Sequence, residues 1–132
     1  MIRRLWALLR TGRVFTAGVV VSNDPRTIGL KAESRVARHL RWRGWRIVAR
    51  NWIGGGGELD VVASRWRTLL VVEVRQRSSS TAAFASVDAD KLARTRATAA
   101  ALVRRHGLER YRQCFEVAAV DERGRITRRI ID

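Results

Sequence analysis

Residues 57–77 read Gly-Glu-Leu-Asp-Val-Val-Ala-Ser-Arg-Trp-Arg-Thr-Leu-Leu-Val-Val-Glu-Val-Arg-Gln-Arg, and the expected fold is built around this segment. It contains two apolar, β-rich runs, 59–63 and 69–74. The short polar segment 64–68 separates them, which is the usual pattern of a β-hairpin. We therefore predict two adjacent strands here, with their side chains next to each other.

Two carboxylates interrupt these apolar runs, Asp60 in the first and Glu73 in the second. Strand side chains alternate between faces, so Glu73 shares a face with Val71 and Arg75. Charges in such surroundings are rarely buried unless they are paired or bind a metal. One alternative is that Glu73 only pairs with an arginine of the neighbouring strand at a sheet edge. Two acidic positions on paired strands, followed directly by Glu-x-Arg, favour a chemical role instead.

The same segment resembles a known signature. Gly-Glu-Leu-Asp60, a turn, and then Val-Val-Glu73-Val-Arg75-Gln-Arg77 is similar to the YraN-like family of predicted endonucleases, which has the restriction-endonuclease-like PD-(D/E)xK core. The resemblance extends over residues 28–130. It includes Gly29, Glu33, Ala37, Leu40, Gly44-Trp45, Asn51-Trp52 and, where the family has Phe-Asp-Val, Phe115-Glu116-Val117.

The resemblance implies a catalytic set of Glu33, Asp60, Glu73 and Arg75, in which Glu33 is the acidic residue that the first helix contributes to the active-site cleft. Arg75 stands where the family pattern has lysine. A guanidinium cannot lose its proton as a desolvated ammonium can, so Arg75 is restricted to positioning and charge stabilisation. Lys31 and Lys91 are the only lysines in an arginine-rich chain. Drift toward arginine could therefore have produced Arg75.

The chain is strongly basic, with 27 Lys and Arg against 12 Asp and Glu and a formal net charge of +15 over 132 residues. Its length fits one domain. A net charge of this size indicates a polyanionic partner such as nucleic acid, with an anionic membrane surface as the weaker alternative. We expect nucleic acid, with DNA favoured, and assign phosphate contacts to Arg77, Lys91 and Arg94.

Residues 1–26 are expected to be a poorly ordered N-terminal extension, separated from a domain at 27–132 by the turn cluster that contains Pro25. An amphipathic helix is the alternative for this extension. Its apolar runs are too short and too interrupted for a signal peptide or a membrane span. The sequence therefore predicts a cytoplasmic protein without stable membrane insertion.

The rest of the domain predicts an α/β fold of order α-β-β-β-α-β-β, a mixed central sheet flanked by helices that agrees with the α-β-β-β-α-β core of the family. We expect helices at 28–43 and 87–106 and further strands at 45–51, 114–120 and 125–131. Residues 52–57 and 78–81 are expected to be loops, the first of them flexible. A short crossover would bring Lys91 and Arg94 near the carboxyl end of strand 69–74.

These residues suit phosphodiester hydrolysis. Two carboxylates a few ångströms apart do not readily both ionise without a cation, so we expect Mg²⁺ or Mn²⁺ between Asp60 and Glu73. The first hypothesis is a metal-dependent endonuclease, with branched or structured DNA among its expected substrates and with an activity weakened by Arg75. The second is an inactive nucleic-acid binder of the same fold. The third is a basic accessory protein whose partner is another protein or a membrane surface.

Overall fold

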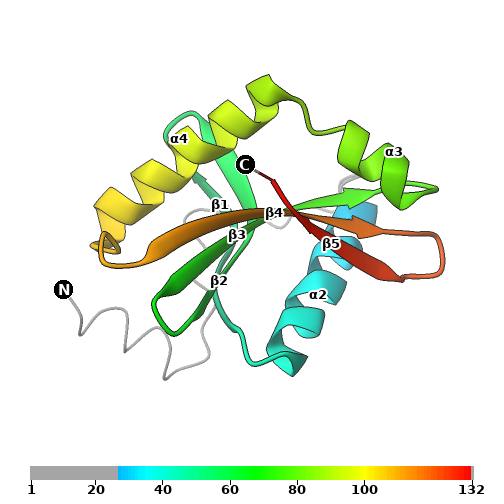
Figure 1. Cartoon of the computed structure of the whole chain (residues 1–132), viewed down its shortest axis with the longest axis horizontal. Helices are drawn as coiled ribbons and strands as arrows, with labels where there is room; N and C mark the ends of the chain where they lie inside the picture. The colour runs from blue at the N-terminus through cyan, green and yellow to red at the C-terminus, as the bar shows by residue number, and fades with distance from the viewer. Residues whose placement is uncertain (1–26, 132) are drawn as a thin grey trace.

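The computed structural model describes residues 27–131. A five-stranded sheet of order β1-β2-β3-β4-β5 forms the centre, and only the β3–β4 pair is parallel. Figure 1 shows α2 on one side of the sheet and α3 and α4 on the other. The elements are α2 (Thr27–Trp42), β1 (Arg46–Gly54), β2 (Gly57–Arg65), β3 (Thr68–Gln76), α3 (Ser80–Ala85), α4 (Ala89–His106), β4 (Arg112–Val120) and β5 (Ile126–Ile130). The predicted mixed α/β fold is confirmed; the expected extension at residues 1–26 lies outside the described residues.

Apolar side chains of the sheet form a core on each face, because successive strand residues point to opposite sides. On one face Val62 and Val71 pack with Leu102 of α4. On the other, Val61 and Val72 pack with Val36 and Leu40 of α2. The hairpin strands β2 and β3 are thus covered on both sides, which explains why their sequence is almost continuously apolar.

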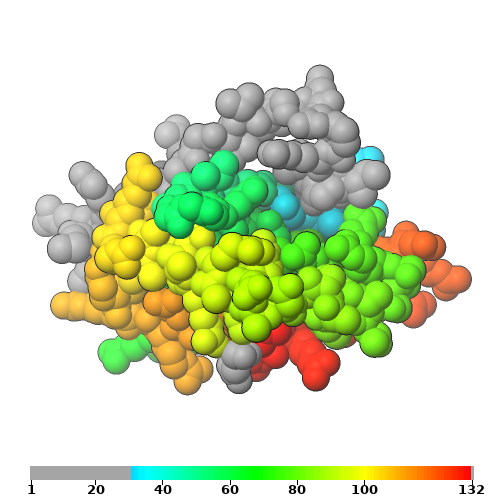
Figure 2. Space-filling model, turned by 90° about the horizontal axis from the view of Figure 1, so that it is seen from above, coloured from blue at the N-terminus to red at the C-terminus, as the bar shows by residue number. Residues whose placement is uncertain are grey.

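The β1–β2 connection differs from the flexible loop expected at residues 52–57. β1 continues to Gly54, β2 begins at Gly57, and Gly55 and Gly56 form a two-residue turn with φ of 57° and 80°. Positive φ at both central residues is the requirement of a type I′ hairpin, which glycine meets without steric cost. A Cβ added at Gly57 would collide with Thr98 Oγ1 of α4. The hairpin end therefore lies directly against α4, as Figure 2 also shows.

The crossover from β3 to β4 contains two helices, whereas residues 78–81 were expected to be a loop. The Ser79 side chain accepts a hydrogen bond from the Ala82 N–H and so caps the N-terminus of the short helix α3. The run of serines had indicated a loop at this position. Asp88 caps α4 in the same way, accepting from the Lys91 N–H at 2.8 Å. Gly107, with φ of 66°, ends α4 where the sequence predicted. The Asp88 cap fixes the first turn of α4, and with it Lys91, beside the end of β3.

Candidate functional site

The candidate site lies where β2 and β3 stop pairing, at the carboxyl end of β3. The ladder between the two strands ends with Val61 opposite Val72, and Asp60 and Glu73 are the next residues on each strand. The Asp60 carboxylate accepts a hydrogen bond from the Val74 backbone N–H at 2.9 Å. The Asp60 side chain thus provides the hydrogen-bond acceptor for a backbone N–H of β3 at the point where β2 and β3 no longer pair. This hydrogen bond holds Asp60 at the strand end.

Glu73 is buried, with 5% of its surface exposed, and its Oε1 faces two cations. The Arg75 guanidinium lies 3.3 Å from this oxygen and the Lys91 ammonium 3.4 Å from it. Arg75 is two residues further along β3 and shares its face, whereas Lys91 comes from the first turn of α4. The alternative considered from sequence, that Glu73 pairs with an arginine of the neighbouring strand at a sheet edge, is wrong: β3 is the central strand, and the partners of Glu73 are Arg75 of its own strand and Lys91 of α4.

Glu33 reaches the site from α2, as the family resemblance implied. Burial raises the pKa of Glu33 from 4.5 to about 7; a hydrogen bond with the Asn51 side chain opposes the rise, and the negative charge of Glu58 adds to it. Asn51 is itself buried and has φ of 49°, a conformation that asparagine tolerates better than most residues. Arg50 lies near this carboxylate, with its guanidinium donating to the Ser34 hydroxyl at 2.7 Å.

The carboxylates of the site act on one another. Burial raises the pKa of Asp60 well above its ordinary value, and the negative charges of Glu73 and Glu33 raise it further. The hydrogen bond from Val74 favours the charged form and opposes this rise. Carboxylates from α2, β2 and β3 are therefore close enough for the charges of Glu33 and Glu73 to act on Asp60.

Two buried polar atoms of the site have no hydrogen-bond partner within the described chain, Glu33 Oε2 and Arg75 Nε. Buried groups of this kind are uncommon in folded proteins and often mark a position where an ion, water or ligand binds. One is an acceptor suited to a cation, and the other is a donor suited to an anion. Residues 27–131 contain no group of three or more His, Cys, Asp or Glu side chains arranged as a metal cluster. A cation here would thus rely on Asp60 and Glu73, with water and substrate oxygens as its other ligands.

The remaining predicted residues lie around the site or away from it. Arg77 and Arg94 are exposed, Arg77 just beyond β3 and Arg94 one turn after Lys91 on α4. Glu116 stands where the family motif has aspartate, and it does not belong to the cluster of Glu33, Asp60 and Glu73. Both its oxygens accept from Arg128 of β5, at 2.7 and 3.2 Å.

Sequence reasoning thus named the residues that meet at this strand end, although it placed Lys91 among phosphate contacts and not against Glu73. It missed the supporting role of Asn51, which entered only as part of a family motif. An asparagine next to the apolar Trp52 within a strand, a residue type that adopts positive φ, was the available signal.

The mixed sheet flanked by helices, with acidic side chains at the shared end of β2 and β3, defines a restriction-endonuclease-like α/β protein. Residues 32–120 match the uncharacterised protein family UPF0102, which is the YraN-like family, and the chain belongs to it.

Relatives from three bacteria carry the name UPF0102 protein. That of Paenarthrobacter aurescens is 37% identical over 108 residues, which cover 80% of this chain and 89% of the relative. That of Dinoroseobacter shibae is 38% identical over 101 residues, or 74% and 73% of the two chains. That of Methylorubrum extorquens is 40% identical over 80 residues, or 61% and 62%. These names state the family and no activity.

Within the described part of the chain, no helix is long and apolar enough to span a membrane.

Proposed function

We propose that this protein is a metal-dependent endonuclease that hydrolyses phosphodiester bonds of nucleic acid, with DNA, including branched or structured DNA, as the favoured substrate. The observation that carries the proposal is the group of carboxylates at the end of β2 and β3, where burial and then the negative charges of Glu73 and Glu33 raise the pKa of Asp60. We place this activity in the cytoplasm.

Asp60 and Glu73 are the proposed ligands of Mg²⁺ or Mn²⁺. A divalent cation would offset the repulsion among the carboxylates, stabilise charge on the phosphoryl oxygens and activate the attacking water. The orphaned Glu33 Oε2 supports a third interaction, direct or through water, from the α2 side. The Val74 N–H holds Asp60 in place for this role.

Arg75 and Lys91 supply positive charge on the other side of Glu73. Both cations lie against Glu73 Oε1, so they compensate the charge of a buried carboxylate. With substrate present, they are placed to stabilise negative charge that develops on the scissile phosphate. The free Arg75 Nε offers one donor for this purpose. Exposed Arg77 and Arg94 extend the positive surface to flanking phosphates.

A second candidate function is nucleic-acid binding without cleavage. Arg75 favours it, because this residue occupies the lysine position of the family pattern and a guanidinium cannot give up its proton. Lys91 favours the enzyme, because it supplies an ammonium to the same Glu73 oxygen from α4.

The experiment that tests the proposal is incubation of the purified protein with duplex, single-stranded and branched DNA in Mg²⁺, in Mn²⁺ and in EDTA. Cleavage should require a divalent cation and should disappear in Asp60→Asn. Glu109→Gln is the matched control, because it also neutralises one carboxylate but at an exposed position beyond α4. Binding without cleavage in either metal would favour the second candidate, and cleavage that survives Asp60→Asn would contradict the assigned site.

A further inference from the structure

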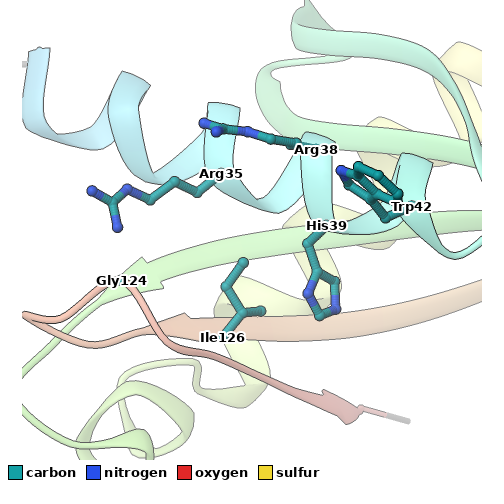
Figure 3. Close-up of a pocket in the computed structure, with 6 residues that line it drawn as sticks. All are labelled: Arg35, Arg38, His39, Trp42, Gly124 and Ile126. Carbon is teal, nitrogen blue, oxygen red and sulfur yellow. The ribbon is translucent and has the colours of Figure 1, made fainter.

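A basic groove follows the outer face of α2, away from the carboxylates. Its volume is about 430 Å³, and α2 and the β4–β5 hairpin provide its walls. Figure 3 shows Arg35, Arg38 and Trp42 projecting from α2, with His39 beside Ile126 of β5. The groove is lined by Arg35, Arg38, His39, Trp42, Gly124 and Ile126.

The four α2 residues of this groove form one stripe of the helix, because positions 35, 38, 39 and 42 follow the spacing at which helical side chains become neighbours. The core residues Val36 and Leu40 lie on the opposite side of α2. At 1.5 Å per residue the stripe is about 10 Å long.

The cations of the stripe are not neutralised within the described chain. Neither Arg35 nor Arg38 forms an ion pair with residues 31–131, in contrast to Arg75 and Arg128. The surroundings of His39 are positive as well. Burial lowers the pKa of His39, and the charges of Arg43 and Arg128 lower it further, against the opposing charge of Glu116.

Trp42 adds a stacking platform to this positive surface. Its side chain is 84% exposed, although a tryptophan normally buries most of its large apolar area. Proteins that bind single-stranded nucleic acid combine a basic groove for the backbone with exposed aromatic rings on which bases stack. Duplex DNA keeps its bases stacked on one another, so an exposed indole offers it much less.

The groove continues toward the end of β3 on the α2 face of the sheet. A smaller hollow of about 80 Å³ shares Arg35 and Gly124 with it and is lined in addition by Lys31 and Gln76, among others. Gln76 is the last residue of β3, and because strand side chains alternate, it lies on the α2 face of the sheet whereas Glu73 lies on the α4 face. Gly124 has φ of 79°, and a Cβ there would collide with the Arg35 guanidinium, so the glycine lets this arginine lie against the β4–β5 turn where the two hollows meet.

Asp121 also lines the smaller hollow. Its Oδ1 accepts from the backbone N–H groups of Arg123 and Arg125, both at 2.9 Å, so it is occupied in shaping the turn. Glu122 brings a further negative charge to this hollow, and the net positive character therefore lies in the larger groove.

We infer that the α2 groove binds a single-stranded arm of a nucleic-acid substrate, with guanidinium groups of Arg35 and Arg38 on its phosphates and a base stacked on Trp42. The inference rests on the proposed action on nucleic acid and narrows the substrate to one with a single-stranded segment, such as a tail, flap or open branch.

The test measures binding by fluorescence anisotropy of the full chain in EDTA, so that neither metal nor cleavage contributes. The probes are a short labelled single strand, the duplex of the same sequence and vesicles containing phosphatidylserine. Trp42→Ala should weaken single-strand binding about tenfold and duplex binding less than twofold, because the substitution removes the stacking platform. Trp42→Phe should retain most of the single-strand affinity.

Arg35→Gln/Arg38→Gln should reduce the slope of log affinity against log salt by about 1.4, or 0.7 for each single-strand phosphate that is no longer neutralised. Arg104→Gln/Arg105→Gln is the control, because it removes the same charge from the exposed last turn of α4. Groove variants that bind the single strand like this control would overturn the inference. Loss of vesicle binding in the groove variants, with single-strand binding unchanged, would also overturn the inference.

These outcomes are separate from those of the proposed enzyme. A wild type that binds single strands through the groove but cleaves nothing would leave the inference standing and remove the nuclease. If the wild type cleaves DNA and the groove variants bind the single strand as tightly as the wild type, the nuclease stands and the inference fails. Thermal unfolding of each variant verifies that the surface changes leave the fold intact.

Discussion

Glu33→Gln should stabilise the metal-free protein at neutral and alkaline pH. The carboxyl of Glu33 is partly buried beside other acidic groups, and its pKa is raised from 4.5 to about 7. At 1.36 kcal/mol for each pKa unit, this corresponds to about 3 kcal/mol against the ionised form. Because part of the side chain contacts solvent, we reduce the expected gain to about 1–2 kcal/mol. Glutamine keeps the shape and the capacity to hydrogen-bond with Asn51.

The pH dependence gives this prediction its sign. Below about pH 4.5 Glu33 is protonated in both folded and unfolded states, so the substitution should change little. Between 4.5 and about 7 the folded state binds more protons than the unfolded state, and wild-type stability falls as pH rises. The full cost is present above this window. Glu33→Gln removes it, so the two proteins should diverge from pH 4.5 upward.

Urea unfolding in EDTA at about pH 4.5 and about pH 8 measures the effect, with Glu109→Gln as an exposed control. The reasoning is refuted if Glu33→Gln gains nothing at the higher pH, or gains as much at the lower one. Added Mn²⁺ should narrow the difference between wild type and Glu33→Gln, since a cation offsets the repulsion that the substitution relieves.

Three further outcomes are expected. Calorimetric titration with Mn²⁺ should detect a site in the wild type and much weaker binding in Asp60→Asn, while equal binding would make these carboxylates ordinary strand-end charges. Lys91→Gln should tighten Mn²⁺ binding, because the ammonium competes for Glu73 Oε1; weaker binding would contradict this competition. Gly57→Ala should lose about 1–3 kcal/mol of unfolding free energy by collision with Thr98, and an unchanged urea midpoint would show that α4 gives way.

The strands and the acidic pair could be predicted because local patterns determine them. Apolar runs around a polar turn define a hairpin, and period 2 places Glu73 and Arg75 on one face. The position of Lys91 near the end of β3 was expected on the condition of a short crossover, and it is found there although the crossover also contains α3. The role of Glu33 came from the family resemblance, since its spacing on α2 alone did not identify a partner.

The features that escaped prediction depend on tertiary contacts or on single backbone angles. The glycine run was expected to be flexible, yet contact with α4 and two positive φ values fix it as a tight turn. The serine run was expected to be a loop, although Ser79 caps a helix. Nothing local to Lys91 indicates its ion pair with Glu73, and nothing local to Arg35 indicates that Gly124, 89 positions later, lies against it.

The most direct test of the proposed endonuclease compares wild type, Arg75→Lys and Arg75→Lys/Asp60→Asn on duplex, single-stranded and branched DNA in Mn²⁺. We predict weak cleavage by the wild type and a rise of about tenfold or more with Arg75→Lys, equivalent to about 1.4 kcal/mol of barrier. The double variant should be inactive while remaining folded. No cleavage by either of the first two proteins, with folding and metal binding intact, would contradict the nuclease and leave nucleic-acid binding as the better account.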